Sequence, residues 1–424
     1  MLGPLNVKLA EFGVSSQHGF LPEQLPLRQL PDEYYQGWEL IVGNLPALLK
    51  TKTLRQAVDS LPVLTTSKLE GEREWQRAYM LLSFMAHAYI WGGDQPSERL
   101  PAQVSVPFLD VANHFDLPTT ATYAALNLWN FTSSSPTGEL SLDDLSTLHT
   151  FTGTEDESWF YLVSVAIEAR GAEVIRVMLQ AMDAVRADES ATVAASLLTF
   201  GTCVEEISVL LERMYEKCSP HVFYHQIRPF LAGSKNMAVA GLPNGVFYEE
   251  GDGKGQWRQY SGGSNAQSSL IQFFDIVLGV EHTPTKNSKV AAVGPKAKHG
   301  FLQEMRRYMP GYHSKFLSHM ESIANIRPYA LNNTSPEVTA AYNMAVARLS
   351  SFRDVHIQIV TRYILNPSRI KNEESKTSAS AGLNLAVASS NSATTKGLHG
   401  TGGTELLPFL KQSRDETRAT GLEV

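Results

Sequence analysis

The sequence predicts an all-α protein. Apolar residues recur at helical spacing through 157–187, a stretch without proline. A second long run, 335–365, has Ser335 placed to cap its start, Pro336 at the first helical position, and Asn366-Pro367 at its end. Strand-like alternation of apolar and polar residues is scarce, so we expect helices to supply most of the core.

The other segments are predicted from the proline, glycine and polar residues that interrupt helices. The first forty residues contain several prolines and mixed polar residues, which predicts an extended arm, with helices beginning near Glu33. Residues 188–190 should break the first long helix before another one, giving a helical hairpin. Eight glycines crowd 232–263, which predicts a loop, with or without a short β-hairpin. Helix should resume after Ser264.

Two further segments are predicted as loops. Residues 282–300 are rich in lysine and poor in apolar side chains, so this loop should be mobile. Residues 370–400 are rich in Ser, Ala, Asn, Thr and Lys, and we expect them to be disordered because they bury too little surface to offset the entropy of ordering. No internal repeat is present.

Composition limits the compartment and the partners. The formal net charge of -7 argues against a nucleic-acid partner, which would require clustered Lys and Arg. The two cysteines, Cys203 and Cys218, are too few to staple a secreted fold. The N-terminus lacks the pattern of a signal peptide, and no stretch approaches roughly 18 uninterrupted apolar residues. We therefore expect a cytoplasmic protein without a membrane partner.

One histidine lies in the apolar stripe of the second long helix. His356 falls in helical register with Leu349, Phe352, Ile359 and Tyr363. From these residues alone, a core histidine bonded to a backbone carbonyl is the favoured interpretation. The alternative is an axial ligand, because such a stripe also suits the flat apolar face of a haem.

Arg228 is the second unusual residue, because apolar and aromatic residues flank it and a guanidinium is seldom buried without an anion. It could pair with a nearby Glu, or its planar fork could bind a ligand carboxylate. His221 and His225 are four residues apart but lack a third metal ligand, which argues against a zinc site. Walker, dinucleotide-binding and Gly-x-Ser-x-Gly motifs are absent from the sequence.

Several motifs, spread from about residue 75 to the C-terminus, resemble the indoleamine 2,3-dioxygenase family. The framework motifs are His-Ala-Tyr-Ile-Trp-Gly-Gly at 87–93, Leu-Pro at 100–101, Val-Pro at 106–107 and Phe-Tyr-Glu at 247–249. The more specific motifs are Gly-Gly-Ser at 262–264 with Gln-Ser-Ser at 267–269, the run 301–310, the run 356–365, and Gly-Thr-Gly-Gly-Thr at 400–404.

This resemblance implies a helical protein with a small N-terminal domain, 1–150, and a large C-terminal domain, 151–424, with haem b between them. It also reverses the interpretation of His356, which becomes the proximal iron ligand. The other residues that it places around the haem are Gly263, Ser264, Asn265, Arg353 and Asp275, the last two paired near a propionate. Without the resemblance, Arg353 and Asp275 would be interpreted as a surface ion pair.

The resemblance also implies a mostly apolar substrate pocket, in which Arg228 holds the carboxylate and Ser164 either forms a hydrogen bond or only packs. Its residues are expected to be Tyr123, Phe160, Ser164, Phe223, Tyr224, Arg228, Leu231 and Thr401. Thr401 and its glycine neighbours would close over the amino-acid end as a lid. Three positions depart from residues that are usual in the family: Tyr224, Asn265 and Ser234.

The implied activity is opening of the indole ring of L-tryptophan with O2 to give N-formyl-L-kynurenine, the first step of the kynurenine pathway and of NAD biosynthesis. Catalysis would depend on positioning, with no acid or base from the protein. A monomer and an electron donor that keeps the iron ferrous are also implied. The alternatives are a haem protein that acts on another indoleamine or on peroxide, a haem-linked sensor, and a helical signalling scaffold.

Overall fold

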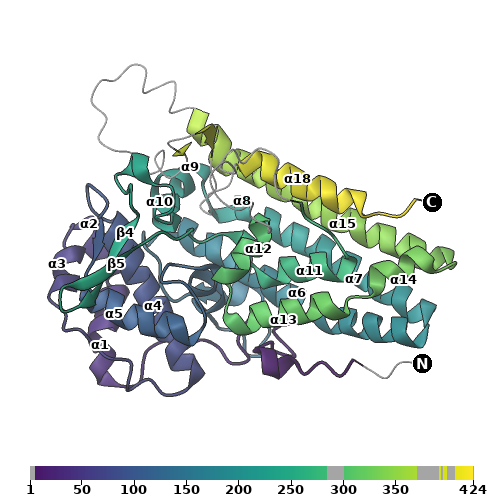
Figure 1. Ribbon diagram of the computed structural model, residues 1–424, viewed down its shortest axis with the longest axis horizontal. Coiled ribbons are helices and arrows are strands. Elements are labelled where there is room, and N and C mark those ends of the chain that lie inside the picture. The colour runs from purple at the N-terminus through teal and green to yellow at the C-terminus, as the bar shows by residue number, and fades with distance from the viewer. Residues whose placement is uncertain (1–4, 284–299, 370–390, 393–394, 399–405, 424) are drawn as a thin grey trace.

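The computed structural model describes residues 5–283, 300–369, 391–392, 395–398 and 406–423 (Figure 1). Helices dominate this part of the chain and its strands are short, which confirms the predicted fold class. Residues 284–299 of the mobile loop predicted at 282–300 lie outside the described residues, as does most of the loop predicted at 370–400.

The N-terminal part is an arm followed by five helices. The arm contains one short 3-10 turn, and helix begins at Glu33 as predicted. The elements are η1 (Leu9–Phe12), η2 (Glu33–Tyr35), α1 (Gln36–Gly43), α2 (Leu45–Lys50), α3 (Leu54–Asp59), α4 (Gly71–Trp91) and α5 (Ala102–His114). Buried side chains cover most of the surface of α4, and an ion pair inside this part joins Arg77 on α4 to Glu39 on α1 at 2.5 Å. The helix α4 is therefore the central helix of the N-terminal part.

In the part of the chain that the structure describes, three small sheets interrupt the helices. In the first, β1 (Arg99–Leu100) pairs in parallel with β4 (Val246–Gly251), which pairs antiparallel with β5 (Lys254–Arg258). The predicted glycine-rich loop thus contains the short hairpin. The others are β2 (Phe131–Ser133) with β3 (Leu145–Thr147), and β6 (Asn391–Ser392) with β7 (Thr395–Leu398). The pair β6–β7 contradicts the expectation of disorder at those six residues, because a backbone ladder gives them regular structure.

The C-terminal part is a bundle of long helices. It begins with α6 (Glu155–Ala187) and α7 (Ser190–Glu212), which form the predicted helical hairpin. Thr154 caps α6 by accepting a hydrogen bond from the amide of Glu157, and Asp188 ends the helix in the left-handed conformation. The other long helix, α15 (Pro336–Val360), starts at the Ser335 cap as predicted and continues into a π-helical turn, η9 (Thr361–Leu365).

Shorter elements complete the structure. Two precede α6: the π-helical turn η3 (Ala124–Leu128) and the 3-10 turn η4 (Leu142–Asp144). Those that follow α7 are α8 (Met214–Lys217), α9 (Pro220–Val222), η5 (Phe223–Ile227), α10 (Arg228–Leu231), η6 (Ala238–Ala240), η7 (Asn265–Gln267), α11 (Ser269–Leu278), α12 (Phe301–Met305), η8 (Arg306–Tyr308), α13 (Gly311–Ile323), α14 (Ile326–Asn332) and α18 (Leu406–Ala419). Figure 1 shows α18 lying along α15.

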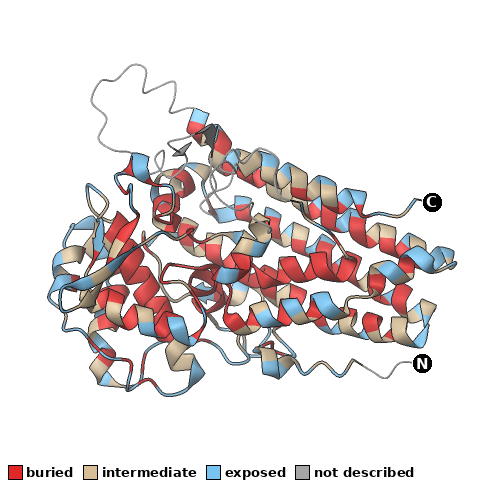
Figure 2. Ribbon diagram, viewed as in Figure 1, coloured by how far each residue is buried: buried red, intermediate tan, exposed pale blue. Residues whose placement is uncertain are grey.

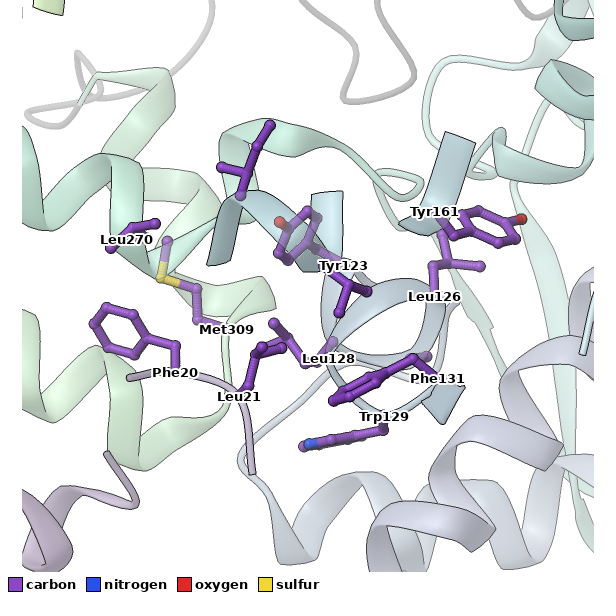
Figure 3. Packing of buried hydrophobic residues seen from close by; sticks show 14 of the residues in the cluster. Phe20, Leu21, Tyr123, Leu126, Leu128, Trp129, Phe131, Tyr161, Leu270 and Met309 are labelled. Carbon is purple, nitrogen blue, oxygen red and sulfur yellow. The ribbon is translucent and has the colours of Figure 1, made fainter. Parts of the chain in front are cut away.

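One continuous core of buried side chains runs through both parts (Figure 2). Phe20 and Leu21 of the N-terminal arm lie near Met309 and Leu270 of the C-terminal part (Figure 3). The strand pair β1–β4 also joins the two parts, so the division into domains at residue 150 stays a prediction. The segment Ser190–Lys217 is long and apolar enough to cross a membrane by composition, but half of its apolar window is buried, and it packs against α6 and α15 as a core helix does.

Candidate functional site

A divided cavity lies among α6, α10, α11, α15 and α18. Its larger chamber holds about 1150 Å3 and its smaller chamber about 850 Å3, both counted to their open mouths. The side chains that line both chambers are Tyr123, Ser164, Leu211, Asn265, Ala266, His356, Phe409 and Leu410. The two chambers therefore form one site with shared walls.

His356 borders both chambers from the middle of α15 and is half-buried. Burial, together with the positive charge of Arg353, lowers the pKa of His356 to about 4, so its imidazole is neutral at physiological pH. No described residue forms a hydrogen bond with the ring. A core histidine would be bonded to a carbonyl, whereas this one presents a free lone pair to a cavity from a rigid helix, as an axial ligand must.

Charged side chains gather at the end of the smaller chamber. Arg353 contacts Asp275 at 2.5 Å, Asp275 contacts His282 at 3.0 Å, and His282 contacts Glu416 of α18 at 2.8 Å. The side chains of Asp275 and Arg353 are only 7% and 11% exposed, so the pair is buried and not the surface ion pair that the residues alone suggested. The Nε of Arg353 is buried and has no hydrogen-bond partner in the described part of the chain, which leaves a donor for a carboxylate.

The charges in this chain of contacts shift one another's pKa. Burial alone would raise the pKa of Asp275, but the positive charges of Arg353 and His282 lower it below its usual value. Burial alone would lower the pKa of His282, but the Asp275 carboxylate raises it. The residues thus fit a haem: a neutral imidazole for the iron, apolar walls for the ring, and a cationic end for its propionates.

Arg228 lines the larger chamber from α10 and is fully buried. Burial lowers the pKa of Arg228 to about 10, which still leaves the guanidinium charged at neutral pH. Tyr224 does not line either chamber. It is completely buried, and its ring lies 5.7 Å from Cζ of Arg228, so it supports the guanidinium.

The remaining walls of the larger chamber are mostly apolar. The rings of Phe160 and Phe223 lie 4.9 Å apart, and Leu231 is beside them. Gly263 borders the chamber where a Cβ atom would come within 2.5 Å of the Leu126 side chain, so a larger residue would require Leu126 to move. The other predicted residues that line the cavity are Tyr123, Ser164, Ser264, Asn265, Asp275 and Arg353. Thr401 lies outside the described residues.

The sequence reasoning missed two features of the site. One is α18, which contributes Phe409, Leu410 and Ser413 to the cavity. The other is Glu168, one helical turn after Ser164, whose carboxylate accepts hydrogen bonds from Tyr123 and Ser268. A glutamate inside the apolar face of a long helix was the available signal for the second, and nothing local marked the first.

A neutral histidine and a buried arginine border one largely apolar cavity, and these are the features of a helical protein that binds a cofactor. The family model for indoleamine 2,3-dioxygenase matches residues 8–420, and the chain belongs to this family. Its members are haem-dependent dioxygenases, so the chain is an oxidoreductase that uses a substrate together with O2.

Fungal relatives are similar over almost their whole length. The chain is 45% identical to indoleamine 2,3-dioxygenase of Saccharomyces cerevisiae, over 98% of this chain and 94% of the relative. It is 43% identical to indoleamine 2,3-dioxygenase nanC of Aspergillus nanangensis, with 98% of each chain covered. It is 38% identical to 6-hydroxytryptophan 2,3-dioxygenase fscD of Fusarium equiseti, with 97% of each chain covered.

Proposed function

We propose that the protein cleaves the C2–C3 bond of the indole ring of L-tryptophan with O2, giving N-formyl-L-kynurenine. This would be the first step of the kynurenine pathway and of NAD biosynthesis. The observation that carries the proposal is that Arg228 and His356 line the same chamber. A charged, buried guanidinium suits an amino-acid carboxylate, and a neutral imidazole suits a haem iron. The chamber therefore has one group for the substrate and one for the cofactor.

His356 would be the proximal ligand of one haem b, and Arg353 would donate to a propionate. The haem, when bound, supplies the activation of oxygen. Gly263, Ser264 and Asn265 line the larger chamber, and they would contact the edge of the ring.

The chain's own residues would bind and orient the substrate. Arg228 can hold both carboxylate oxygens through its fork, and burial strengthens this contact because water does not compete. Phe160 and Phe223 would pack on the indole. Ser164 lines the same chamber. The carboxylate and the imidazole among the described lining residues are Asp275, which pairs with Arg353, and His356, which is assigned to the iron. Catalysis would therefore come from orientation and exclusion of water.

The test is an optical assay of the purified, haem-loaded protein after reduction with dithionite. L-tryptophan and O2 are added, and the absorbance of N-formylkynurenine is followed for the wild type, Arg228→Ala and His356→Ala. Steady product formation by the wild type alone supports the proposal. A normal haem spectrum without product would refute the tryptophan activity and favour a haem-linked sensor.

A second candidate function is cleavage of a substituted indole. The relative from Fusarium equiseti is named for 6-hydroxytryptophan, so ring substituents are accepted by at least one similar protein. The assay therefore compares kcat/KM for L-tryptophan and 6-hydroxytryptophan. A higher value for the hydroxylated substrate would change the assignment of substrate but not of chemistry.

We also propose a cytoplasmic monomer that depends on an external electron donor. Cys203 and Cys218 are free and buried, and burial raises the pKa of each thiol to about 12, which suits a reducing compartment. Gel filtration and cell fractionation test these points.

A further inference from the structure

A buried glutamate connects two walls of the cavity. Glu168 on α6 is only 1% exposed, and its Oε1 accepts hydrogen bonds from the Tyr123 hydroxyl at 3.0 Å and from Ser268 Oγ at 2.7 Å. Its other oxygen, Oε2, is buried and has no hydrogen-bond partner within the described ranges. One carboxylate oxygen therefore holds two hydroxyl groups from segments far apart in the sequence.

Both hydroxyl groups belong to residues that shape the cavity. Tyr123 lines both chambers, and its backbone amide is fixed by the side chain of Gln267 at 2.9 Å. Ser268 lines the smaller chamber and caps α11 by accepting a hydrogen bond from the amide of Ile271. The helix α11 also carries Asp275, which orients Arg353. A displacement of Glu168 would thus move both the cavity wall formed by Tyr123 and the charged end that holds Arg353.

No described cation neutralises Glu168. Burial raises the pKa of Glu168 to about 7, and the hydrogen bonds from Ser268 and Tyr123 only partly oppose this shift. The described titratable groups on neighbouring elements do not neutralise Glu168. Asp275 of α11 pairs with Arg353 and His282. The Cys203 thiol of α7 stays neutral, because burial raises its pKa to about 12. On α15, Arg353 and His356 border the cavity, but neither forms an ion pair with Glu168.

We propose that Glu168 is a positioning residue, which ties the Tyr123 wall of the cavity to α11 and so keeps the substrate and cofactor sides aligned. The proposal rests on the proposed function and adds a residue to it. A hydroxyl donates more strongly to a carboxylate than to a neutral carboxyl group, so Tyr123 is held most firmly when Glu168 is ionised. Substrate binding should therefore tighten as the pH rises through neutrality.

The experiment compares two buried glutamates of the same helix. Glu157 on α6 is also fully buried and accepts hydrogen bonds from Phe151, Thr152 and Tyr161, but it does not line the cavity. Burial raises its pKa as well. KM and kcat for L-tryptophan are measured for haem-loaded Glu168→Gln and Glu157→Gln. The pH is varied from about 6 to about 8, on either side of neutrality.

In the wild type, we expect KM to fall about fivefold from the lower to the higher pH, roughly the factor that one hydrogen bond supplies, with a smaller change in kcat. Glu168→Gln should keep its haem and show a KM that is independent of pH, near the wild-type value at the lower pH. Tyr123→Phe should lose the pH dependence in the same way, because it removes the donor. Glu157→Gln should melt at a lower temperature yet keep the wild-type pH dependence.

A wild-type pH dependence in Glu168→Gln, or its equal loss in Glu157→Gln, would overturn the proposal. The result is separable from the proposed function, because the dissociation constant of L-tryptophan can be read without turnover from the change that it causes in the haem absorption band. Wild-type protein that binds L-tryptophan with the expected pH dependence but forms no product would contradict the proposed activity alone. Binding without pH dependence would contradict the role of Glu168 alone.

Discussion

Two helices form opposite kinds of wall for the cavity: α6 is built into the core, whereas α18 is attached largely by polar contacts. The helix α6 buries a long apolar face that includes Val163, Ile167 and Val174, and it packs along α7. In contrast, the fully buried residues of α18 are Ser413 and Thr417. Its apolar residues Phe409 and Leu410 are half-buried and face the cavity.

Polar contacts hold α18 in place, together with an edge contact between the rings of Phe409 and Phe301 at 4.9 Å. Glu416 accepts hydrogen bonds from the amide and hydroxyl of Thr283 and contacts His282, and Arg414 pairs with Asp354 of α15 at 2.9 Å. Apolar packing changes little with pH or salt, whereas ion pairs change with both. From this difference we expect the α6 wall to fix the shape of the site and the α18 wall to loosen before the core unfolds.

The largest effect is expected from His356→Ala. Loss of an outer-shell partner costs about 10–100-fold in metal affinity, so loss of the proposed ligand itself should cost more and leave purified protein without haem. The ratio of haem absorbance to protein absorbance measures this. His221→Ala, at an exposed histidine, is the control and should retain haem. A fully loaded His356→Ala protein would place the iron ligand elsewhere.

Arg228→Ala should leave haem binding intact and raise KM for L-tryptophan about a hundredfold, because the truncation removes a buried charged contact worth about 3 kcal/mol. Steady-state kinetics with N-formylkynurenine absorbance give the number. Arg348→Ala removes an arginine that pairs with Glu205 at the surface of α15, and it should change KM by less than about twofold. If both variants behave alike, Arg228 does not bind the substrate.

The long helices could be predicted from the sequence because their caps and apolar periodicity are local. The Ser335 cap and the break after Ala187 each lie within one turn of the helix that they define. The pairing of β1 with β4 could not be predicted, because β1 is two residues long and its partner lies far along the chain. Such short strands carry no periodic signal.

The site shows the same limit. The apolar stripe around His356 was visible, but only the surrounding cavity, together with the absence of a bonded carbonyl in the described part of the chain, favours a ligand over a core histidine. Glu168 meets Tyr123 across 45 positions of sequence, and Tyr224 turned out to lie behind Arg228 and not beside the cavity. These facts depend on tertiary contacts, which no local pattern encodes.

The attachment of α18 should depend on pH through His282. Its pKa is raised in the folded protein, so the stabilisation from protonated His282 between Asp275 and Glu416 is complete below the unfolded value of 6.5 and is lost as the pH rises through the folded value. We expect haem to dissociate about five to ten times faster above that range, a change of roughly 1 kcal/mol. Transfer of haem to an acceptor apoprotein, followed by stopped-flow absorbance, measures the rate.

Glu416→Gln should remove most of this pH dependence of α18, because it removes the charge through which α18 contacts His282, although Asp275 still raises the pKa of His282. His114→Asn breaks a comparable histidine pair with Glu72 away from the cavity and should leave the haem dissociation rate unchanged. An unaltered pH profile in Glu416→Gln would mean that His282 does not control the α18 wall.

The smallest effect is expected at the outer edge of α18. Arg418 contacts Asp354 at 3.2 Å, but its side chain is 63% exposed, so water and salt screen the pair. Arg418→Ala should cost less than about 0.5 kcal/mol and lower the melting temperature by roughly 1 °C. Arg414 is 22% exposed and pairs with both Asp354 and Asp415, so Arg414→Ala should have a larger effect in scanning calorimetry. Equal effects of the two substitutions would mean that the attachment of α18 depends on total charge more than on burial of the ion pair. In that case high salt would weaken haem retention as much as either substitution.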